Sequence, residues 1–204
     1  MSHPGRRRVA LLVNLIAPYR AGLYDELARY LDLEIIFSGN EDNRVDWDDT
    51  EHRLSRARAR RSWGWVFKRD RPGHAGHPAG EPFDVRYVHI TPGYALDLVR
   101  FRPDIILTSE LGFRTLVAIS YGLIAHVPVW VMVEASPYTE RCVGPARAAL
   151  RRLMLPLIHH WIAVGECSRQ YLDSIHVAPS HVTMVQNTVD ETPFIGARNM
   201  PKPR

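Results

Sequence analysis

The chain has 204 residues, of which 46% are hydrophobic, and its 26 basic and 22 acidic side chains give a formal net charge of +4. This composition excludes an intrinsically disordered chain and suffices for one sizeable domain with its own core. No apolar run approaches the roughly 20 residues of a membrane-spanning helix, and two cysteines, Cys142 and Cys167, exclude a disulfide framework.

The chain opens with a basic tail, residues 1–7, followed by the apolar run Val9–Val13. Such a run is typical of a strand buried on both faces inside a parallel sheet. Asn14 interrupts the run, and a helical pattern follows shortly afterwards. We therefore interpret this segment as a strand, a loop and a helix, and not as a secretory signal peptide. The residues expected on one face of that helix are Leu23, Leu27, Tyr30 and Leu31.

Apolar runs and alternating patterns predict six further strands. They lie at Leu33–Phe37, Val85–Ile90, Pro103–Thr108, Val127–Val133, Trp161–Val164 and Val182–Val185. Helical patterns are predicted at residues 96–99, 112–125, 146–160 and 169–175. Because strands and helices alternate, we expect an α/β fold with a doubly wound, mainly parallel Rossmann-like sheet and helices on both faces.

Two of these helices carry specific expectations. Pro156 lacks a backbone amide and should kink or end the helix 146–160. Ser168 can cap the helix Arg169–Ile175. One face of the helix 146–160 is expected to be apolar; it consists of Leu150, Leu153, Met154, Leu157 and Ile158.

Residues 40–82 are predicted to form a long irregular insertion. The segment opens acidic, becomes rich in arginine around Arg53–Arg61, and continues through Trp63, Trp65 and Phe67. The aromatic side chains could anchor the loop, stack on bases or sugars, or enter a membrane surface. His74 and His77 have nominal metal-ligand spacing, but no third ligand is nearby, so no metal site is expected.

Polar residues follow several predicted strands, and open α/β sheets bind ligands at the carboxyl ends of their strands. Tyr19 could stack on a ligand or simply pack, and Arg20 could bind it or cover the helix start. Glu134 could accept a hydrogen bond or a proton from a sugar hydroxyl, or form an ion pair or cap. Glu110 could serve similarly, although a helix cap also explains it. Asn187 is expected to fix a turn by bonding the backbone, with ligand contact as the second option.

Five motifs in order resemble the amino-terminal, acceptor-binding domain of family-four glycosyltransferases, which have the two-domain GT-B fold. They are the strand, Pro-Tyr-Arg loop and helix of 8–31, the strand Pro103–Leu107, the strand Pro128–Ser136 with its polar end, the segment Ile162–Ser168 before a helix, and the turn Val185–Asp190 followed by Phe194. Together they cover nearly the whole chain.

This resemblance implies a retaining transferase that moves a sugar from an NDP-sugar donor to an acceptor without a required metal or other cofactor. The implied domain spans residues 8–195, with 196–204 as the start of an interdomain linker and the donor domain absent from this chain. The implied catalytic residue is Glu134, and the implied acceptor-binding residues are Asn14, Tyr19, Arg20, Glu110, Ser136 and Asn187. Many members have a glycine pair in the first loop; here the loop has none, and Arg20 could supply charge instead.

The partners expected from the resemblance are a glycan or lipid-linked sugar acceptor, the NDP-sugar and a separate donor domain. A cytoplasmic location is expected, with peripheral contact at the inner membrane face as an option. A rival interpretation is a catalytically silent Rossmann-like binding or scaffold domain, or a truncated gene product. Nucleic-acid binding through Arg53–Arg61 ranks last, because no recognition module accompanies that cluster.

Overall fold

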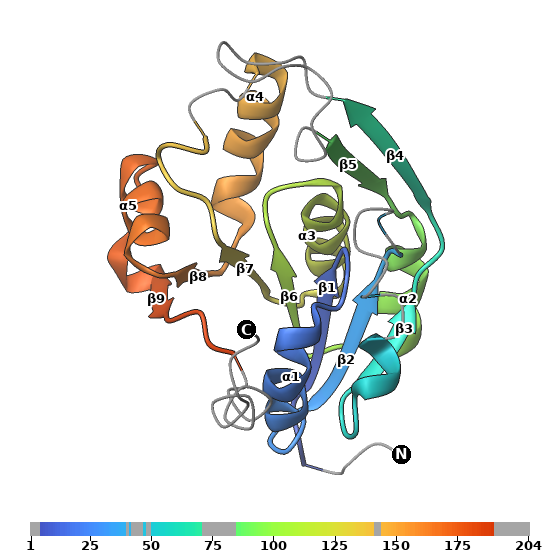
Figure 1. Cartoon of the computed structure of the whole chain (residues 1–204). Coiled ribbons are helices and arrows are strands. Elements are labelled where there is room, and N and C mark those ends of the chain that lie inside the picture. Colours follow the sequence, from blue (N-terminus) through green and yellow to red (C-terminus); the bar gives the residue numbers. More distant parts are fainter. Residues whose placement is uncertain are drawn as a thin grey trace, which may run out of the picture.

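The computed structural model describes residues 5–39, 41, 47, 50–70, 85–140 and 144–189. Its centre is a seven-stranded sheet in the order β3-β2-β1-β6-β7-β8-β9, in which all neighbouring strands are parallel (Figure 1). The strands are β1 (Arg8–Val13), β2 (Asp32–Phe37), β3 (Arg58–Arg61), β6 (Ile105–Ser109), β7 (Val129–Val133), β8 (His160–Val164) and β9 (Val182–Val185). The expected mainly parallel α/β sheet is therefore confirmed.

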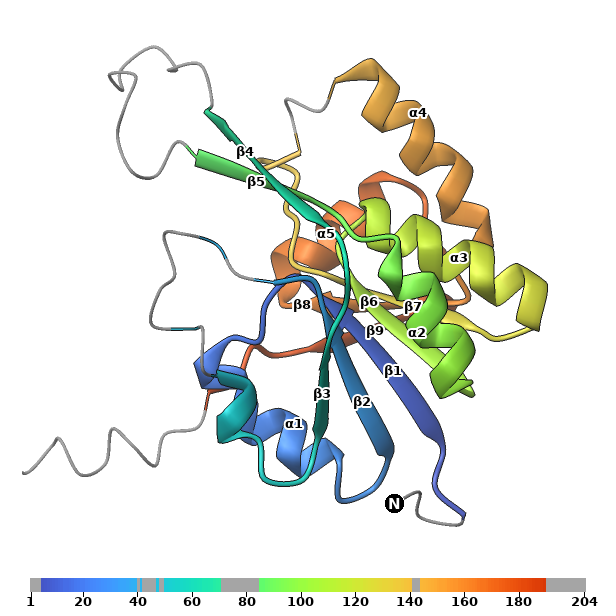
Figure 2. The same cartoon turned by 90° about the vertical axis from the view of Figure 1, so that its right-hand side faces the viewer.

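The helices are α1 (Ala21–Leu27), α2 (Gly93–Phe101), α3 (Phe113–Ala125), α4 (Pro145–Met154) and α5 (Glu166–Ser174). Short 3-10 turns are η1 (Pro18–Arg20), η3 (Thr50–Arg53), η5 (Leu155–Leu157) and η6 (Pro179–His181). Figure 2 shows α1 on one side of the sheet and α2, α3 and α4 on the other. Both faces of the sheet thus carry helices, as expected for a doubly wound fold.

Two hydrophobic clusters flank the sheet, and strand alternation divides the residues of β1 between them. Ala10 and Leu12 face the larger cluster, which contains side chains from α2, α3, α4 and α5. Val9, Leu11 and Val13 face the smaller cluster, which contains Tyr24 of α1. β1 is consequently buried on both faces, as its unbroken apolar run predicted.

Part of the segment expected to be irregular, 40–82, is regular in the structure. β3 pairs with β2, and β4 (Trp65–Asp70) pairs antiparallel with β5 (Val85–Ile90) in a separate two-stranded sheet. β3 forms because β2 carries buried carboxylates: Arg58 binds Asp32 at 2.7 Å, and Arg60 binds Glu34 at 2.5 Å. Charges buried without partners would be costly, so these arginines stabilise the sheet. They are correspondingly less available to nucleic acid.

Three local expectations differ from the structure. In α1, Leu23 is exposed and Tyr24 is buried, because Tyr24 packs with Ala28 in the smaller hydrophobic cluster; Tyr30 lies in the turn after α1 and is exposed. Helix α4 ends at Met154, before Pro156 as expected, but Leu153 faces outward. Helix α5 begins at Glu166, so Ser168 is buried within it instead of capping it. The remaining expectations for 1–4, 71–84 and 190–204, including His74 and His77, lie outside the described residues.

Asp25 ties α1 to the start of β3. Its carboxylate accepts hydrogen bonds from the backbone amides of Ser55, Arg56 and Ala57 at 2.8–2.9 Å, and from the Ser55 hydroxyl at 2.7 Å. Burial alone would raise the pKa of Asp25, but these bonds outweigh it and hold the pKa below the ordinary 3.8.

We expect Asp25→Asn to lower the free energy of unfolding by about 2 kcal/mol at pH 7, because hydrogen bonds to a charged acceptor are lost. The depressed pKa means that this contribution is complete above about pH 4 and is lost as the pH falls through the folded-state pKa. Urea unfolding should therefore show the gap between wild type and variant shrinking at acid pH. Glu26→Gln is the matched control: its exposed carboxylate bonds only Arg29 within the described chain, and its loss should cost under about 0.5 kcal/mol.

Candidate functional site at the carboxyl edge of the sheet

The candidate site lies where the strand order reverses. From β1 the chain moves outward to β2 and β3, and it returns to the other side of β1 at β6 before continuing to β9. In open α/β sheets this switch point, at the carboxyl ends of the strands, is the usual place for a ligand. Asn14 follows β1 there, Glu110 follows β6 and Glu134 follows β7.

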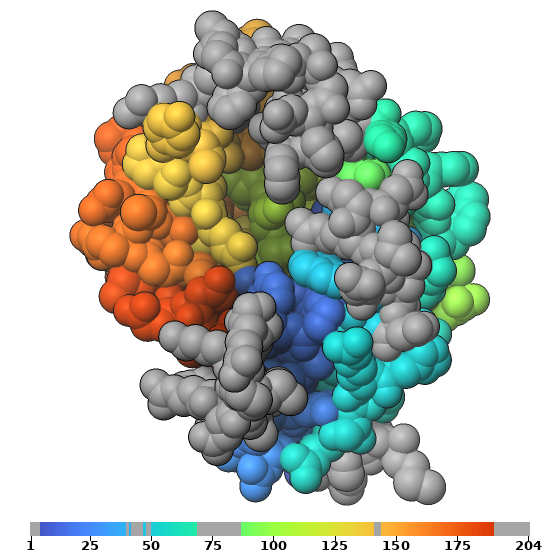
Figure 3. Space-filling view, in the orientation of Figure 1, coloured from blue at the N-terminus to red at the C-terminus, as the bar shows by residue number. Residues whose placement is uncertain are grey.

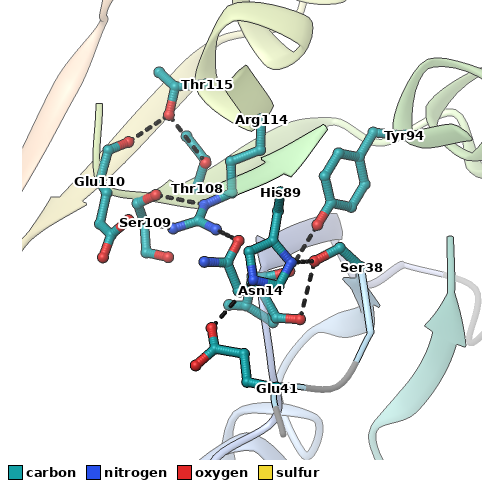
Figure 4. Close-up of polar contacts among 11 residues, drawn as sticks. Asn14, Ser38, Glu41, His89, Tyr94, Thr108, Ser109, Glu110, Arg114 and Thr115 are labelled. Atoms are coloured by element: carbon teal, nitrogen blue, oxygen red, sulfur yellow. Dashed lines mark hydrogen bonds and ion pairs between the residues drawn. The ribbon is translucent and has the colours of Figure 1, made fainter. Parts of the chain in front are cut away.

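Arg114 of α3 connects the ends of β1 and β6 (Figure 4). Its Nη1 donates to the side-chain oxygen of Asn14, its Nη2 donates to Glu110 at 2.9 Å, and its Nε donates to the carbonyl of Ser109 at 2.6 Å. The arginine is 6% exposed, so these partners satisfy a largely desolvated charge. Two predicted site residues, Asn14 and Glu110, are thereby brought together by a residue that was not predicted.

Glu110 has an unusual backbone. Its φ is +64°, in the left-handed region that side-chain-bearing residues seldom adopt. Two hydrogen bonds hold this conformation. The Thr115 hydroxyl donates to the Glu110 carbonyl at 2.5 Å, and the Glu110 amide donates to the backbone carbonyl of Met132 in β7 at 3.0 Å. It leaves the Glu110 carboxylate 69% exposed at the sheet edge. Strained backbone of this kind is concentrated at functional sites, which supports assigning Glu110 to the site.

A second unpredicted group is His89 of β5, whose ring is held at both nitrogens. Nδ1 lies 2.6 Å from the hydroxyl of Ser38, and Nε2 lies 3.1 Å from a carboxylate oxygen of Glu41 (Figure 4). The Ser38 hydroxyl is also 3.2 Å from the carbonyl oxygen of Asn14. Nearby, the Tyr94 hydroxyl donates to the carbonyl of Val13 at 2.7 Å. These contacts fix the backbone at the end of β1.

The other predicted pair, Arg20 and Glu134, forms an ion pair across the same edge. Nη2 of Arg20 donates to the Glu134 carboxylate, and Nη1 lies 4.0 Å from the sulfur of Met132. Burial would lower the pKa of Arg20, but the hydrogen bond and charge of Glu134 raise it above its ordinary value. Arg20 is therefore a fixed cation, and it orients a carboxylate that is itself half exposed.

The remaining predicted residues are less engaged. Tyr19 is partly exposed, packs edge-to-face on Trp47 with ring centroids 5.9 Å apart, and lies beside Arg20. Ser136 forms a closed turn with Thr139, to which its amide donates at 2.9 Å. Asn187 lies at the same edge after β9, two strands from β7. Its exposed side chain has no hydrogen-bond partner among the described residues, so the expected turn-fixing bond is not seen.

A cavity of about 120 Å³ opens at the switch point. Its polar lining includes Asn14, His89, Glu110, Arg114 and Arg147. Within the described ranges, Arg147 makes no hydrogen bond or ion pair, so its charge is available to an anionic group. Figure 3 shows the recess, with the olive residues around the start of α3 between the yellow segment after β7 and the blue segment after β1. Sites that enclose a small-molecule ligand usually measure about 300 Å³ or more. This cavity is too small to enclose such a ligand and would form one wall of a larger site.

A wider groove of about 800 Å³ lies at the amino ends of β2 and β3. It is lined by Arg6, Arg29, Arg56 and Arg58 among others, but Arg58 is already bound to Asp32 and Arg29 to Glu26. Size alone would favour this groove. We assign the site to the smaller cavity, because open α/β sheets bind ligands at their carboxyl edge and because the strained Glu110 lies there.

Of the predicted residues, Asn14 and Glu110 line the cavity at the switch point, and Arg20 and Glu134 pair with each other farther along the same edge, at the end of β7. The residues that were missed are Arg114, Arg147 and His89. A weak signal existed for Arg114, since Glu110 and Arg114 have the i, i+4 spacing of a helical ion pair. No comparable signal marked His89, which occupies a strand outside the main sheet. None of the described residues form a cluster of three or more potential metal ligands.

The sequence matches no protein-family model and no curated protein. Solved structures resemble the fold. The UDP-GlcNAc 2-epimerase of Neisseria meningitidis, bound to UDP-GlcNAc, has a TM-score of 0.58 at 18% identity, over 94% of this chain and 49% of that one. Alr3699/HepE of Anabaena, in complex with UDP-glucose, has a TM-score of 0.59 at 12% identity, over 92% and 45%.

A third neighbour, the UDP-GlcNAc 2-epimerase of Methanocaldococcus jannaschii, has a TM-score of 0.53 at 11% identity, over 88% of this chain and 45% of that one. The chain therefore spans about half the length of these proteins. At such low identity the likeness concerns the fold, which is the Rossmann-like fold found in GT-B-like structures. In the described ranges no helix is long and apolar enough to cross a membrane.

Proposed function

We propose that the chain is one domain of a two-domain nucleotide-sugar enzyme, and specifically the amino-terminal, acceptor-binding domain of a retaining GT-B glycosyltransferase. The observation that carries this proposal is that two charged groups lie along the carboxyl edge of the sheet: Asn14–Arg114–Glu110 at the switch point, and Arg20–Glu134 at the end of the neighbouring strand β7. The fold shared with proteins solved with UDP-GlcNAc or UDP-glucose supports the substrate class.

The geometry suggests a role for each group. Glu134, held by Arg20, would accept a hydrogen bond from the attacking acceptor hydroxyl and take its proton as the hydroxyl oxygen bonds to the sugar and the bond between the sugar and the NDP breaks, which releases the NDP. Exposed Tyr19 would offer an aromatic face to a sugar ring, and Glu110 a further acceptor for sugar hydroxyls. Arg147 lines the cavity and has no partner among the described residues, so it would bind an anionic group of either substrate.

The small cavity implies that a second wall is needed. The proposed enzyme would place the NDP-sugar mostly on a donor domain facing this edge, with transfer in the cleft between the two domains. The chain alone would then bind an acceptor weakly and transfer nothing. This account favours an enzyme domain over a silent scaffold, because a scaffold has no need of the strained Glu110 or of an available cation beside it.

A direct test incubates the chain with radiolabelled UDP-GlcNAc and UDP-glucose and with a panel of glycan and lipid-linked acceptors. The same mixtures are then assayed with a donor domain supplied either fused to this chain or as a separate chain. Transfer only in the second set is the expected result. Robust transfer by this chain alone would overturn the half-enzyme view, and no transfer in either set would overturn the proposal.

A second candidate function is epimerisation at C2 of UDP-GlcNAc, because several of the similar solved structures are named as enzymes of that reaction. The two candidates differ in their need for an acceptor. Conversion of UDP-GlcNAc in the two-domain assay without any acceptor would favour the epimerase. Strict dependence on an acceptor would favour the transferase.

A further inference from the structure

The wide groove at the amino ends of β2 and β3 has no part in the reaction proposed above. Its volume of about 800 Å³ lies within the usual range of small-molecule sites. The turn that follows α1, the turn that precedes β3 and the segment before β1 meet there, at the lower end of the molecule in Figures 1 and 2. The groove therefore has room for a ligand of its own, at the edge of the sheet opposite the cavity.

The groove carries an excess of positive charge. The charged residues that line it are four arginines and one aspartate: Arg6, Arg29, Arg56, Arg58 and Asp32. Two of the arginines are bound to carboxylates, since Arg58 binds Asp32 at 2.7 Å and Arg29 binds Glu26 at 3.1 Å. These ion pairs are close to neutral, so the groove keeps the charges of the other two arginines.

Arg6 and Arg56 both have hydrogen-bond donors to spare. Nη1 of Arg6 donates to the carbonyl of Ala28 at 3.1 Å, and its other N–H groups have no partner within the described chain. The exposed side chain of Arg56 makes no hydrogen bond or ion pair with a described residue; only its backbone amide is engaged, with Asp25. Because β2 lies between β1 and β3, the two arginines line the groove from opposite sides.

An aromatic ring completes the lining. Tyr30 lies just before β2, lines the groove and is 67% exposed. Guanidinium groups bind phosphate oxygens in a forked geometry, and an exposed aromatic ring can stack on a base. A terminal phosphate suits these donors best, because it has three acceptor oxygens and more negative charge than an esterified one. One guanidinium on each side of the groove favours a ligand with two phosphate groups.

We propose that this groove binds a ligand with a terminal diphosphate group, which Arg6 and Arg56 hold from its two sides. Two ligands share this chemistry: inorganic pyrophosphate, and a nucleoside diphosphate whose base stacks on Tyr30. A UDP-sugar lacks the terminal phosphate, since its diphosphate is esterified at both ends. The inference rests on the groove alone and does not depend on the reaction proposed above.

The test is nitrogen-15 NMR of the labelled chain at about 0.15 M salt, titrated with pyrophosphate and, separately, with ADP. Both should shift the amides of 28–33 and 55–58. Arg56→Gln should weaken both ligands about tenfold, because a charged donor group is lost. The control is Arg53→Gln, which makes the same change of charge on an exposed arginine of η3 that does not line the groove. It should weaken binding less than about twofold.

Tyr30→Ala separates the two ligands. ADP binding that falls about tenfold while pyrophosphate binding is unchanged supports a nucleoside diphosphate; unchanged binding of both supports pyrophosphate. Three results would overturn the proposal: no shift in the groove with either ligand at millimolar concentration, shifts only in 110–114 at the cavity, or equal weakening by Arg53→Gln and Arg56→Gln. The last would show diffuse attraction by surface charge. The ligand-free spectrum of each variant establishes that it is folded.

Discussion

Replacing Glu134 by glutamine should lower the rate of sugar transfer in the two-domain assay about a hundredfold or more, because a neutral amide cannot take the acceptor's proton. The free energy of unfolding should change little, since the Glu134 side chain is half exposed and the amide oxygen of glutamine can still accept a hydrogen bond from Arg20. Glu26→Gln is a close control: it too removes a half-exposed carboxylate paired with an arginine, and it should leave transfer unchanged.

Arg20 offers an internal check on this prediction. If Arg20 acts by orienting Glu134, Arg20→Met should also reduce transfer, and the double variant should be little worse than Glu134→Gln alone. Transfer that survives Glu134→Gln undiminished would leave the Arg20–Glu134 pair as a feature of the surface and would support the scaffold interpretation.

Arg114 and Arg147 line the same cavity, and their replacement should have opposite consequences. Arg114→Met should lower the free energy of unfolding by about 3 kcal/mol, because Asn14, Glu110 and the carbonyl of Ser109 lose a shared charged donor. Arg114→Lys should recover only part of this loss, since one ammonium cannot reproduce the planar arrangement of three bonds. Urea unfolding measures both values.

Arg147→Met should change stability by less than about 0.5 kcal/mol, because Arg147 has no partner among the described residues. In the transfer assay it should instead raise the KM for whichever substrate presents an anionic group. Two variants with equal stability losses would contradict the distinction between a structural arginine and an available one.

The sequence predicts the strands of the sheet correctly where a local pattern is compatible with only one kind of secondary structure. The buried runs of β1 and β7 predict central parallel strands, and the polar residues after them, Asn14 and Glu134, meet at one edge because parallel strands all end there. The arginines of β3 show where this reasoning fails. Read alone they suggest a basic surface, whereas their partners Asp32 and Glu34 lie in another strand that only the fold brings alongside.

Local sequence patterns also failed to predict which face of a helix is buried and at which residue a helix begins. In α1, Tyr24 and not Leu23 packs in the smaller hydrophobic cluster. Gly165, at φ +80°, lets α5 begin before Ser168. Arg114 and His89 belong to the site because each contacts residues that are distant in the sequence. Such contacts depend on the packed structure and leave little trace in one sequence.

The most direct measurement of the central claim is nitrogen-15 NMR of the labelled chain, titrated with UDP-GlcNAc, UDP-glucose and the acceptor panel. The site at the carboxyl edge predicts shifts in the Arg20 and Arg114 side chains and in the amides of 14–20, 110–114 and 134–140. Shifts confined to the groove formed by 28–33 and 55–58, or no shift with any of these compounds at millimolar concentration, would contradict it.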